Sequence, residues 1–341
     1  MIDWTTLGKA PRILLVAELR PAQGERFQPT GFADLGAAQF TRPDGTDMLL
    51  VESAQSVANR LERTCLDGDG PDIAKELSGL PYVAATLSGL ENPVRTSSLI
   101  EAHRMGSPYF LHNKKFKDRL AKEMKYDPKR PLDWKTIYAT LFRYDPNSLV
   151  HGVFLALLDG GRVRAARAVT GFIEAENVRK VISGGVKNSE VDPTGELQVA
   201  EAEAGEKGVY SNVPYSRVEF TAQTTKAYFN VDLALMRGYG LPVEAFQLLT
   251  ALALLKVRRF LTAHLRLRTA CDFQMKGDVV ATAPADFQVP DEETLLASVR
   301  LGIRDCKALF ADPSVTELET PVKVVKAARK KDDQVSGDAV V

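Results

Sequence analysis

The periodicity of apolar residues near the start of the chain predicts two buried strands and a helix. The apolar runs at residues 13–19 and 48–51 are short and are typical of strands in a sheet. A helical pattern begins at residue 53, and its apolar positions share one face: Ala54, Val57, Ala58 and Leu61. The polar positions 55, 59 and 62 form a stripe on another face. A helix that begins with hydroxyl residues suits contact with a polyanion, although a capped surface helix explains the same pattern.

The later segments contain both kinds of pattern. Residues 151–158 are apolar on both faces, which predicts a central strand, and the turn signal at 159–161 predicts that 164–173 return as its partner. Further elements are predicted from the same periodicities: strands at 217–225, 227–235 and 265–275, and helices at 242–261 and 294–310. Because strands and helices mix without a regular βαβ repeat, the pattern predicts an α+β fold.

Two insertions interrupt a predicted single domain of residues 1–320. Residues 96–148 are helical in pattern and basic, which predicts an inserted helical lobe. Residues 176–215 are acidic, contain glycine and have few large apolar side chains, so we expect a projecting hairpin arm with its tip at 183–189. Residues 321–341 are charged and small, which predicts a disordered tail.

Charge is balanced over the whole chain but segregated along it. The 341 residues include 44 basic and 44 acidic side chains, and this balance argues mildly against a nucleic-acid partner. Residues 245–271 nevertheless carry five cations and no acid, whereas 190–206 carry six acids and no cation. The stretch 114–135 is also basic. Each run is compatible with a solvated face, and their separation along the chain predicts separation in space.

Several kinds of chemistry have no motif in this sequence. The three cysteines, Cys65, Cys271 and Cys306, are widely spaced, which favours a reducing cytoplasm over a disulfide framework. The four histidines lack the spacing of a metal site, and no phosphate-binding loop, dinucleotide fingerprint or nucleophile elbow is present. No stretch is long enough to span a membrane. We therefore expect no metal, no cofactor and no membrane partner.

Three segments together carry a family resemblance: residues 29–32 (PTGF), 49–62 (LLVESAQSVANRLE) and 96–109 (TSSLIEAHRMGSPY). They resemble the backbone subunit of type I-G (formerly I-U) CRISPR effector complexes, a family of the RAMP superfamily, over about residues 13 to 310. The resemblance implies an RRM-like (ferredoxin-like) palm with a thumb-like arm. It also implies a subunit that polymerises along CRISPR RNA beside other effector subunits and presents that RNA for pairing with a target DNA strand in antiviral defence.

Under this hypothesis the protein is not an enzyme, and phosphate and ribose contacts fall on the palm, with further contacts on the arm and on the basic segment. On the palm they are Arg20, Gln28, Thr30, Ser53, Gln55, Asn59 and Arg60, to which Ser97, Ser98, His103 and Arg104 add. At the tip of the arm they are Lys187 and Asn188, and in the basic segment they are Arg258 and Arg259.

Two alternatives remain open at this point. The first is a RAMP-type ribonuclease that cleaves CRISPR RNA or target RNA, for which Asp34, in the loop after the first strand, is the candidate residue. A loop aspartate is more often a cap or turn residue. The pair His103 and Arg104 offers a general acid with an anion-binding partner, although a histidine on a packed helix is the commoner case. The second alternative is an unrelated cytoplasmic enzyme with a helical lid.

Overall fold

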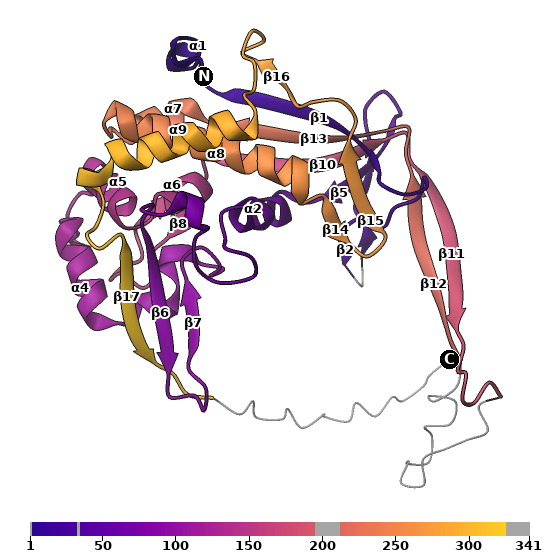
Figure 1. The fold of residues 1–341 in the computed structure, drawn as a ribbon, viewed down its shortest axis with the longest axis horizontal. Helices are drawn as coiled ribbons and strands as arrows, with labels where there is room; N and C mark the ends of the chain where they lie inside the picture. The colour runs from indigo at the N-terminus through magenta and orange to yellow at the C-terminus, as the bar shows by residue number, and fades with distance from the viewer. Residues whose placement is uncertain (1, 33–34, 195–211, 325–341) are drawn as a thin grey trace, which may run out of the picture.

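The computed structural model describes residues 2–32, 35–194 and 212–324, and these fold into a mixed α+β protein (Figure 1). Its largest element is an antiparallel sheet. The strands in spatial order are β14 (Arg266–Arg268), β15 (Cys271–Met275), β1 (Ile13–Pro21), β13 (Thr224–Val231), β10 (Val169–Glu176), β5 (Asp47–Glu52) and β4 (Gln39–Thr41); β16 (Val280–Ala283) also pairs with β1. The predicted α+β class is confirmed, and the strands predicted at 13–19 and 48–51 are β1 and β5.

Alternation along β1 decides which face of the large sheet is buried. The inward residues are at most 3% exposed: Ile13, Leu15, Ala17 and Leu19. The register places Leu15 opposite Phe229 of β13, and Phe229 opposite Gly171 of β10, so the apolar positions of the central strands share one face. This face packs against helices and forms the core.

Four helices belong to the layer that covers the core: α2 (Ala54–Arg63), α7 (Leu233–Gly238), α8 (Val243–Ala263) and α9 (Glu292–Asp305). The helix α2 begins where its sequence pattern predicts, because the Ser53 hydroxyl accepts a hydrogen bond from the Ser56 N–H at 3.3 Å. The helix α8 is buried along most of its length. Within the described ranges, no helix has both the length and the apolar content that a bilayer crossing requires.

Residues 104–151 are mostly helical, and beside them lies a sheet that the sequence patterns did not predict. Its helices are η2 (Arg104–Gly106), α3 (Pro108–Leu111), α4 (Lys114–Glu123), α5 (Trp134–Tyr144) and α6 (Pro146–His151). Beside them lies a sheet of β17 (Val315–Pro321), β6 (Tyr82–Ser88) and β7 (Val94–Ser97), in which β17 runs parallel to β6. The remaining short elements are α1 (Trp4–Lys9), η1 (Lys75–Leu77), η3 (Lys307–Leu309), β2 (Gly31–Phe32) with β3 (Gly36–Ala37), and β8 (Val153–Phe154) with β9 (Arg164–Ala165).

The prediction of a central strand at 151–158 is wrong. His151 ends α6, Gly152 has a φ of +80° that breaks the helix, and only Val153–Phe154 is extended. Leu155 and Leu158 are buried in the turn that follows. A short apolar run is compatible with several buried conformations, and here it forms irregular structure.

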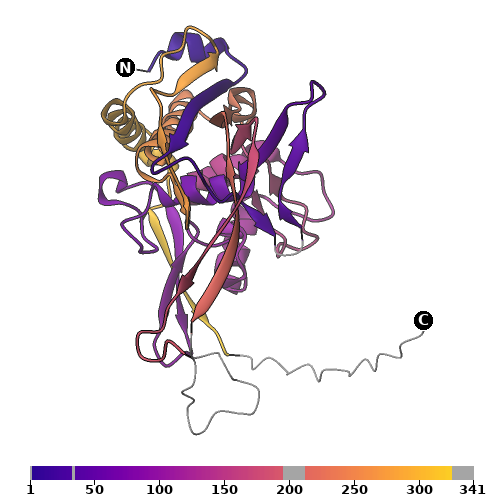
Figure 2. The ribbon, with the colours of Figure 1, turned by 90° about the vertical axis from the view of Figure 1, so that its right-hand side faces the viewer.

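A two-stranded arm projects from one end of the large sheet, made of β11 (Arg179–Lys187) and β12 (Val213–Thr221) (Figures 1 and 2). The tip predicted at 183–189 is wrong, because residues 183–187 lie inside β11 and pair with 213–217. Part of the predicted arm, 195–211, lies outside the described residues. At the other end of the chain, β17 includes Pro321, the first residue of the predicted tail, and 325–341 lie outside the described residues.

Candidate nucleic-acid interface

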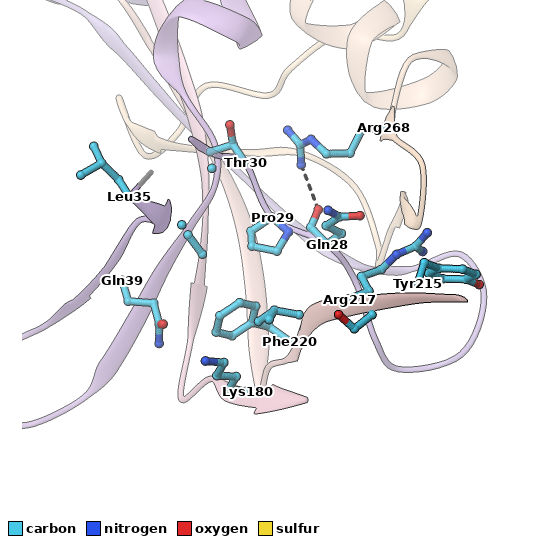
Figure 3. A pocket seen from close by; sticks show the side chains of 15 residues that line it. Gln28, Pro29, Thr30, Leu35, Gln39, Lys180, Tyr215, Arg217, Phe220 and Arg268 are labelled. Atoms are coloured by element: carbon cyan, nitrogen blue, oxygen red, sulfur yellow. Dashed lines mark hydrogen bonds between the residues drawn. The ribbon is translucent and has the colours of Figure 1, made fainter. Parts of the chain in front are cut away.

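A groove of about 920 Å³ lies at the base of the arm (Figure 3). One wall comes from residues 28–31 and the β2–β3 hairpin, and the other comes from Lys180 of β11 and residues 215–220 of β12. Arg268 of β14 also lines the groove. Side chains from four separate parts of the sequence therefore face one open space.

Backbone hydrogen bonds fix the base of the arm to the chain that follows β1. The N–H groups of Phe27 and Phe220 each donate to the other residue's carbonyl oxygen, and both bonds are 2.9 Å long. The two side chains are each 1% exposed, and the Phe27 ring meets Phe273 edge-on at a centroid distance of 5.2 Å. The arm therefore leaves the fold from a fixed position.

Arg268 holds the groove together through hydrogen bonds within the protein. Its guanidinium donates to the carbonyl oxygens of Gln28 and Val51, each at 3.1 Å, and to the carboxylate of Glu52, which is 1% exposed. Burial raises the pKa of the neighbouring Cys271 thiol to about 12, so that thiol is neutral near pH 7. The positive charge of Arg268 is thus matched by a buried carboxylate.

The arm supplies the accessible cations and an exposed aromatic ring. Lys180 is exposed and forms no ion pair with a described residue, and Tyr215 is 53% exposed. The Arg217 guanidinium lies 5.5 Å from the centroid of the Tyr215 ring. The nearby Glu219 is shared by Arg217 at 3.7 Å and Arg26 at 3.6 Å. Because Arg217 and Arg26 share the single buried carboxylate of Glu219, and Lys180 adds a further charge, this wall has an excess of positive charge.

Two glycines create space that the groove needs. A Cβ at Gly31 would lie 2.6 Å from the carbonyl oxygen of Gly36, so the β2–β3 wall closes only without a side chain there. A Cβ at Gly185 would lie 3.0 Å from the hydroxyl oxygen of Tyr215, which is its partner across the arm. The second glycine therefore lets the tyrosine ring lie across the neighbouring strand.

The groove contains two of the residues predicted to contact RNA, Gln28 and Thr30. Arg20 is exposed but lines a separate hollow of about 100 Å³ on another side of the arm base. Lys187 is exposed near the outer end of β11, and Asn188 follows it and is also exposed. These five positions stay compatible with a nucleic-acid contact.

The polar face of α2 does not line the groove. Ser53 caps the helix, and the Gln55 side chain accepts a hydrogen bond from Arg167 at 2.9 Å, while Asn59 is exposed. Arg60 donates to the carbonyl oxygens of Arg266 at 3.2 Å and of Leu267. Desolvation lowers the pKa of Arg60, and its two terminal guanidinium nitrogens both donate within the protein.

Three residues predicted as RNA contacts are buried, so the expectation that they reach a ligand is wrong. Ser97 is 0% exposed and donates to the carbonyl of Pro71, and Ser98 is 1% exposed and accepts from the Val83 N–H at 3.3 Å. Arg104 is 8% exposed and forms a bidentate pair with Glu62 at 2.5 and 2.9 Å. The adjacent His103 is exposed. A polar sequence does not distinguish internal hydrogen bonds from contacts with a ligand.

The basic segment of α8 is also internal, which corrects the prediction for Arg258 and Arg259. These residues are 7% and 9% exposed. Arg258 pairs with Asp278 and donates to the carbonyl oxygens of residues 289 and 290, while Arg259 pairs with Glu76 at 3.0 Å and Glu292 at 2.9 Å. Arg258 and Arg259 therefore offer no exposed phosphate-binding edge, because carboxylates from other segments neutralise both guanidinium groups.

The residues that sequence reasoning missed are Lys180, Tyr215 and Arg217. The available signal was the alternation at 213–221, which places Tyr215, Arg217 and Glu219 on one face of a strand. A sequence alone does not show that this face turns toward residues 28–31. For the alternatives, no group of three or more potential metal ligands occurs within the described residues, and Asp34 lies outside them.

Comparison with known proteins gives one family match. Residues 13–180, just under half of the chain, match the model described as CRISPR-associated protein GSU0053 (Cas_GSU0053). This match supports a CRISPR-associated protein and includes the three segments 29–32, 49–62 and 96–109. None of the curated proteins matches the chain.

Two solved structures show weak similarity. A chain of "CRISPR RNA-guided surveillance complex, pre-nicking" is 16% identical, with a TM-score of 0.39, over 77% of this chain and 76% of that one. Csc2 of Thermofilum pendens is 10% identical, with a TM-score of 0.30, over 91% of this chain and 80% of that one. TM-scores this low support no inference about fold or function, so the family match carries the comparison.

Proposed function

We propose that this protein is a non-catalytic, RNA-binding backbone subunit of a type I CRISPR surveillance complex, of the type I-G kind in the RAMP superfamily. The observation that carries the proposal is the groove beneath the arm, where Lys180, Arg217 and Tyr215 face residues 28–31 within a chain that matches a CRISPR-associated family. Exposed cations beside an exposed aromatic ring are what single-stranded nucleic acid requires, because phosphates need charge and bases need a flat surface.

The order of the central strands supports an RRM-like palm. The segments β1, α2, β10, β13, α8 and β15 follow one another in the chain, and the four strands lie in the order β15–β1–β13–β10. This is the βαββαβ arrangement of the ferredoxin-like fold. In this proposal the arm acts as a thumb that folds over the guide strand.

The mechanism is recognition of backbone and shape, with sequence left to base pairing. Copies of the subunit polymerise along CRISPR RNA beside other effector subunits and present it to a target DNA strand in the cytoplasm. Catalysis has no part in this proposal. Incubation with labelled RNA, with and without a divalent metal, tests that point, and cleavage that Asp34→Ala abolishes would establish the ribonuclease alternative.

The groove itself is tested by measuring affinity for labelled single-stranded RNA as a function of salt. We expect Lys180→Gln with Arg217→Gln to weaken binding and to flatten the slope of log affinity against log salt by about 0.7 for each phosphate that the variant no longer neutralises. The matched control is Lys9→Gln with Lys75→Gln, which removes two exposed lysines elsewhere. Wild-type protein that binds no RNA, even when co-expressed with a CRISPR array and partner subunits, would overturn the function. An unchanged slope in the double variant would move the RNA path away from the groove.

A further inference from the structure

The outward face of α4 has the densest group of unpaired cations that we find on the described surface. Its exposed basic residues, including Lys125 just after the helix, are Lys114, Lys115, Arg119, Lys122 and Lys125. The exposed acid on the same helix is Asp118. A strong local excess of positive charge therefore lies on a protein whose total charge is zero.

None of these five cations has a counter-ion within 4.0 Å among the described residues. The arginines Arg104, Arg258 and Arg259, by contrast, are all paired with carboxylates. Since internal pairing does not use these lysines, their charge is available to an external anion.

The helix that carries them is firmly held from beneath. Phe116 and Leu120 are buried, and the Phe116 ring meets Tyr144 edge-on at 5.7 Å. Arg119 lies over both rings, at 5.5 and 5.4 Å from their centroids, and Lys117 reaches Asp159 at 3.5 Å. The outward cations are thus presented from a rigid support.

A hollow of about 730 Å³ beside the start of α4 is not the better site for an anion. Its walls include Lys114, Lys115 and Arg119 but also Glu317 and Glu319 of β17, and Glu317 is paired with Arg95 at 2.7 Å. The side chain of Asn113 accepts from the Phe116 N–H at 3.1 Å, so the first turn of the helix is already capped. The carboxylate of Glu319 disfavours an anion inside the hollow, whereas Lys122 lies outside the hollow on the same stripe of the helix as Lys115 and Arg119.

We infer that the outward face of α4 binds the phosphate backbone of a nucleic-acid duplex, at a surface separate from the groove. Figure 1 places α4 at the end of the molecule opposite the arm. Lys115, Arg119 and Lys122 follow one another at helical spacing, so they form one continuous stripe. None of the outward residues is aromatic, and Phe116 and Tyr144 are buried, so unpaired bases have no ring to stack on. Charge without stacking suits a duplex, whose bases are already stacked.

This inference does not depend on the proposed function, because its test uses the full chain without guide RNA. The probe is a fluorescein-labelled duplex DNA of arbitrary sequence, and fluorescence anisotropy gives the affinity at several salt concentrations. Lys115→Glu with Lys122→Glu removes two cations from the stripe. If both bind phosphates, we expect affinity to fall on the order of 60-fold at about 0.1 M salt and the salt slope to flatten by about 1.8. The neutral pair Lys115→Gln with Lys122→Gln should give a smaller decrease in affinity.

The control Lys9→Glu with Lys75→Glu changes the total charge by the same amount at exposed sites elsewhere and should retain wild-type affinity. Variants with unchanged thermal melting and reduced duplex binding support the inference. Three results overturn it: no duplex binding by the wild type, equal decreases in duplex affinity for the α4 and control variants, or a larger decrease in single-strand affinity than in duplex affinity for the α4 variant. Binding of single-stranded RNA in the groove is measured separately, so a failure of either proposal is recognised independently.

Discussion

The buried pair of Glu62 and Arg104 separates a structural role from an RNA-binding role for Arg104. Both residues are 8% exposed, and the guanidinium donates to both carboxylate oxygens, at 2.5 and 2.9 Å, and to the Gly152 carbonyl at 3.1 Å. The change Arg104→Met keeps much of the side-chain volume but leaves Glu62 buried without its partner. We expect it to destabilise the fold and to leave RNA binding by the folded protein unchanged.

The size of the effect follows from the uncompensated charge. Removal of one member of a buried pair costs about 3–5 kcal/mol in the free energy of unfolding. For a chain of 341 residues, the entropy of unfolding is about 0.7 kcal/mol per kelvin, so this destabilisation lowers the melting temperature by about 4–7 °C. The double change Glu62→Met with Arg104→Met removes both charges and should lie within about 2 kcal/mol of the wild type.

Denaturant unfolding of the wild type, both single variants and the double variant gives the coupling energy of the pair. The control Arg63→Met removes an exposed arginine of α2, the helix that carries Glu62, and should change the unfolding free energy by less than about 0.5 kcal/mol. If Arg104→Met unfolds like the wild type but binds RNA more weakly, the structural explanation fails. Arg104 would then be the ligand contact that the sequence pattern suggested.

Two further predictions concern the core and the groove wall. Burial and Lys256 lower the pKa of His151 well below its usual value, so only the unfolded state gains a proton as the pH falls below about 6.5. The wild type therefore loses stability between pH 6.5 and 5, and His151→Gln should remove about 1.5 kcal/mol of that loss. Denaturant unfolding at each pH measures this, and an unchanged pH profile would contradict the prediction. Gly31→Ala places a Cβ 2.6 Å from the Gly36 carbonyl oxygen, so it should displace the groove wall and weaken RNA binding. The control Gly8→Ala meets no neighbouring atom and should leave RNA binding unchanged. Equal RNA affinities for the two variants would show that the wall is not part of the interface.

The parts of the fold that follow local patterns were predictable. The apolar run of β1, the long apolar stretch of α8 and the helical period of α9 each lie within one segment, and the sequence contains that information. The Ser53 cap is local in the same way. The parallel pairing of β17 with β6 was not predictable, because it joins segments more than two hundred residues apart.

Only part of the candidate site was predictable, because its residues come from segments that are far apart in the sequence. Gln28 and Thr30 line the groove, as the resemblance suggested, but the cations that face them come from the arm. Arg258 and Arg259 look like solvated charges at a helix end until their partners are known. Arg259 pairs with Glu76, 183 residues away, and Arg258 pairs with Asp278, 20 residues away. Sequence patterns show where charges lie along the chain but not which of them neutralise one another.

A total charge of zero therefore says little about whether this protein binds a polyanion. At physiological ionic strength the Debye length is about 8 Å, so a phosphate responds to the charges within roughly that distance. The ten residues of α4 span about 15 Å, and a phosphate on the outward face meets Lys115, Arg119 and Lys122 with Asp118 as the exposed acid of the helix. Glu317 and Glu319 line a hollow together with Lys115 and Arg119, but Glu317 is paired with Arg95, and acidic residues farther away are screened from the phosphate. The local balance of unpaired charges, which only the folded structure reveals, determines the binding surface.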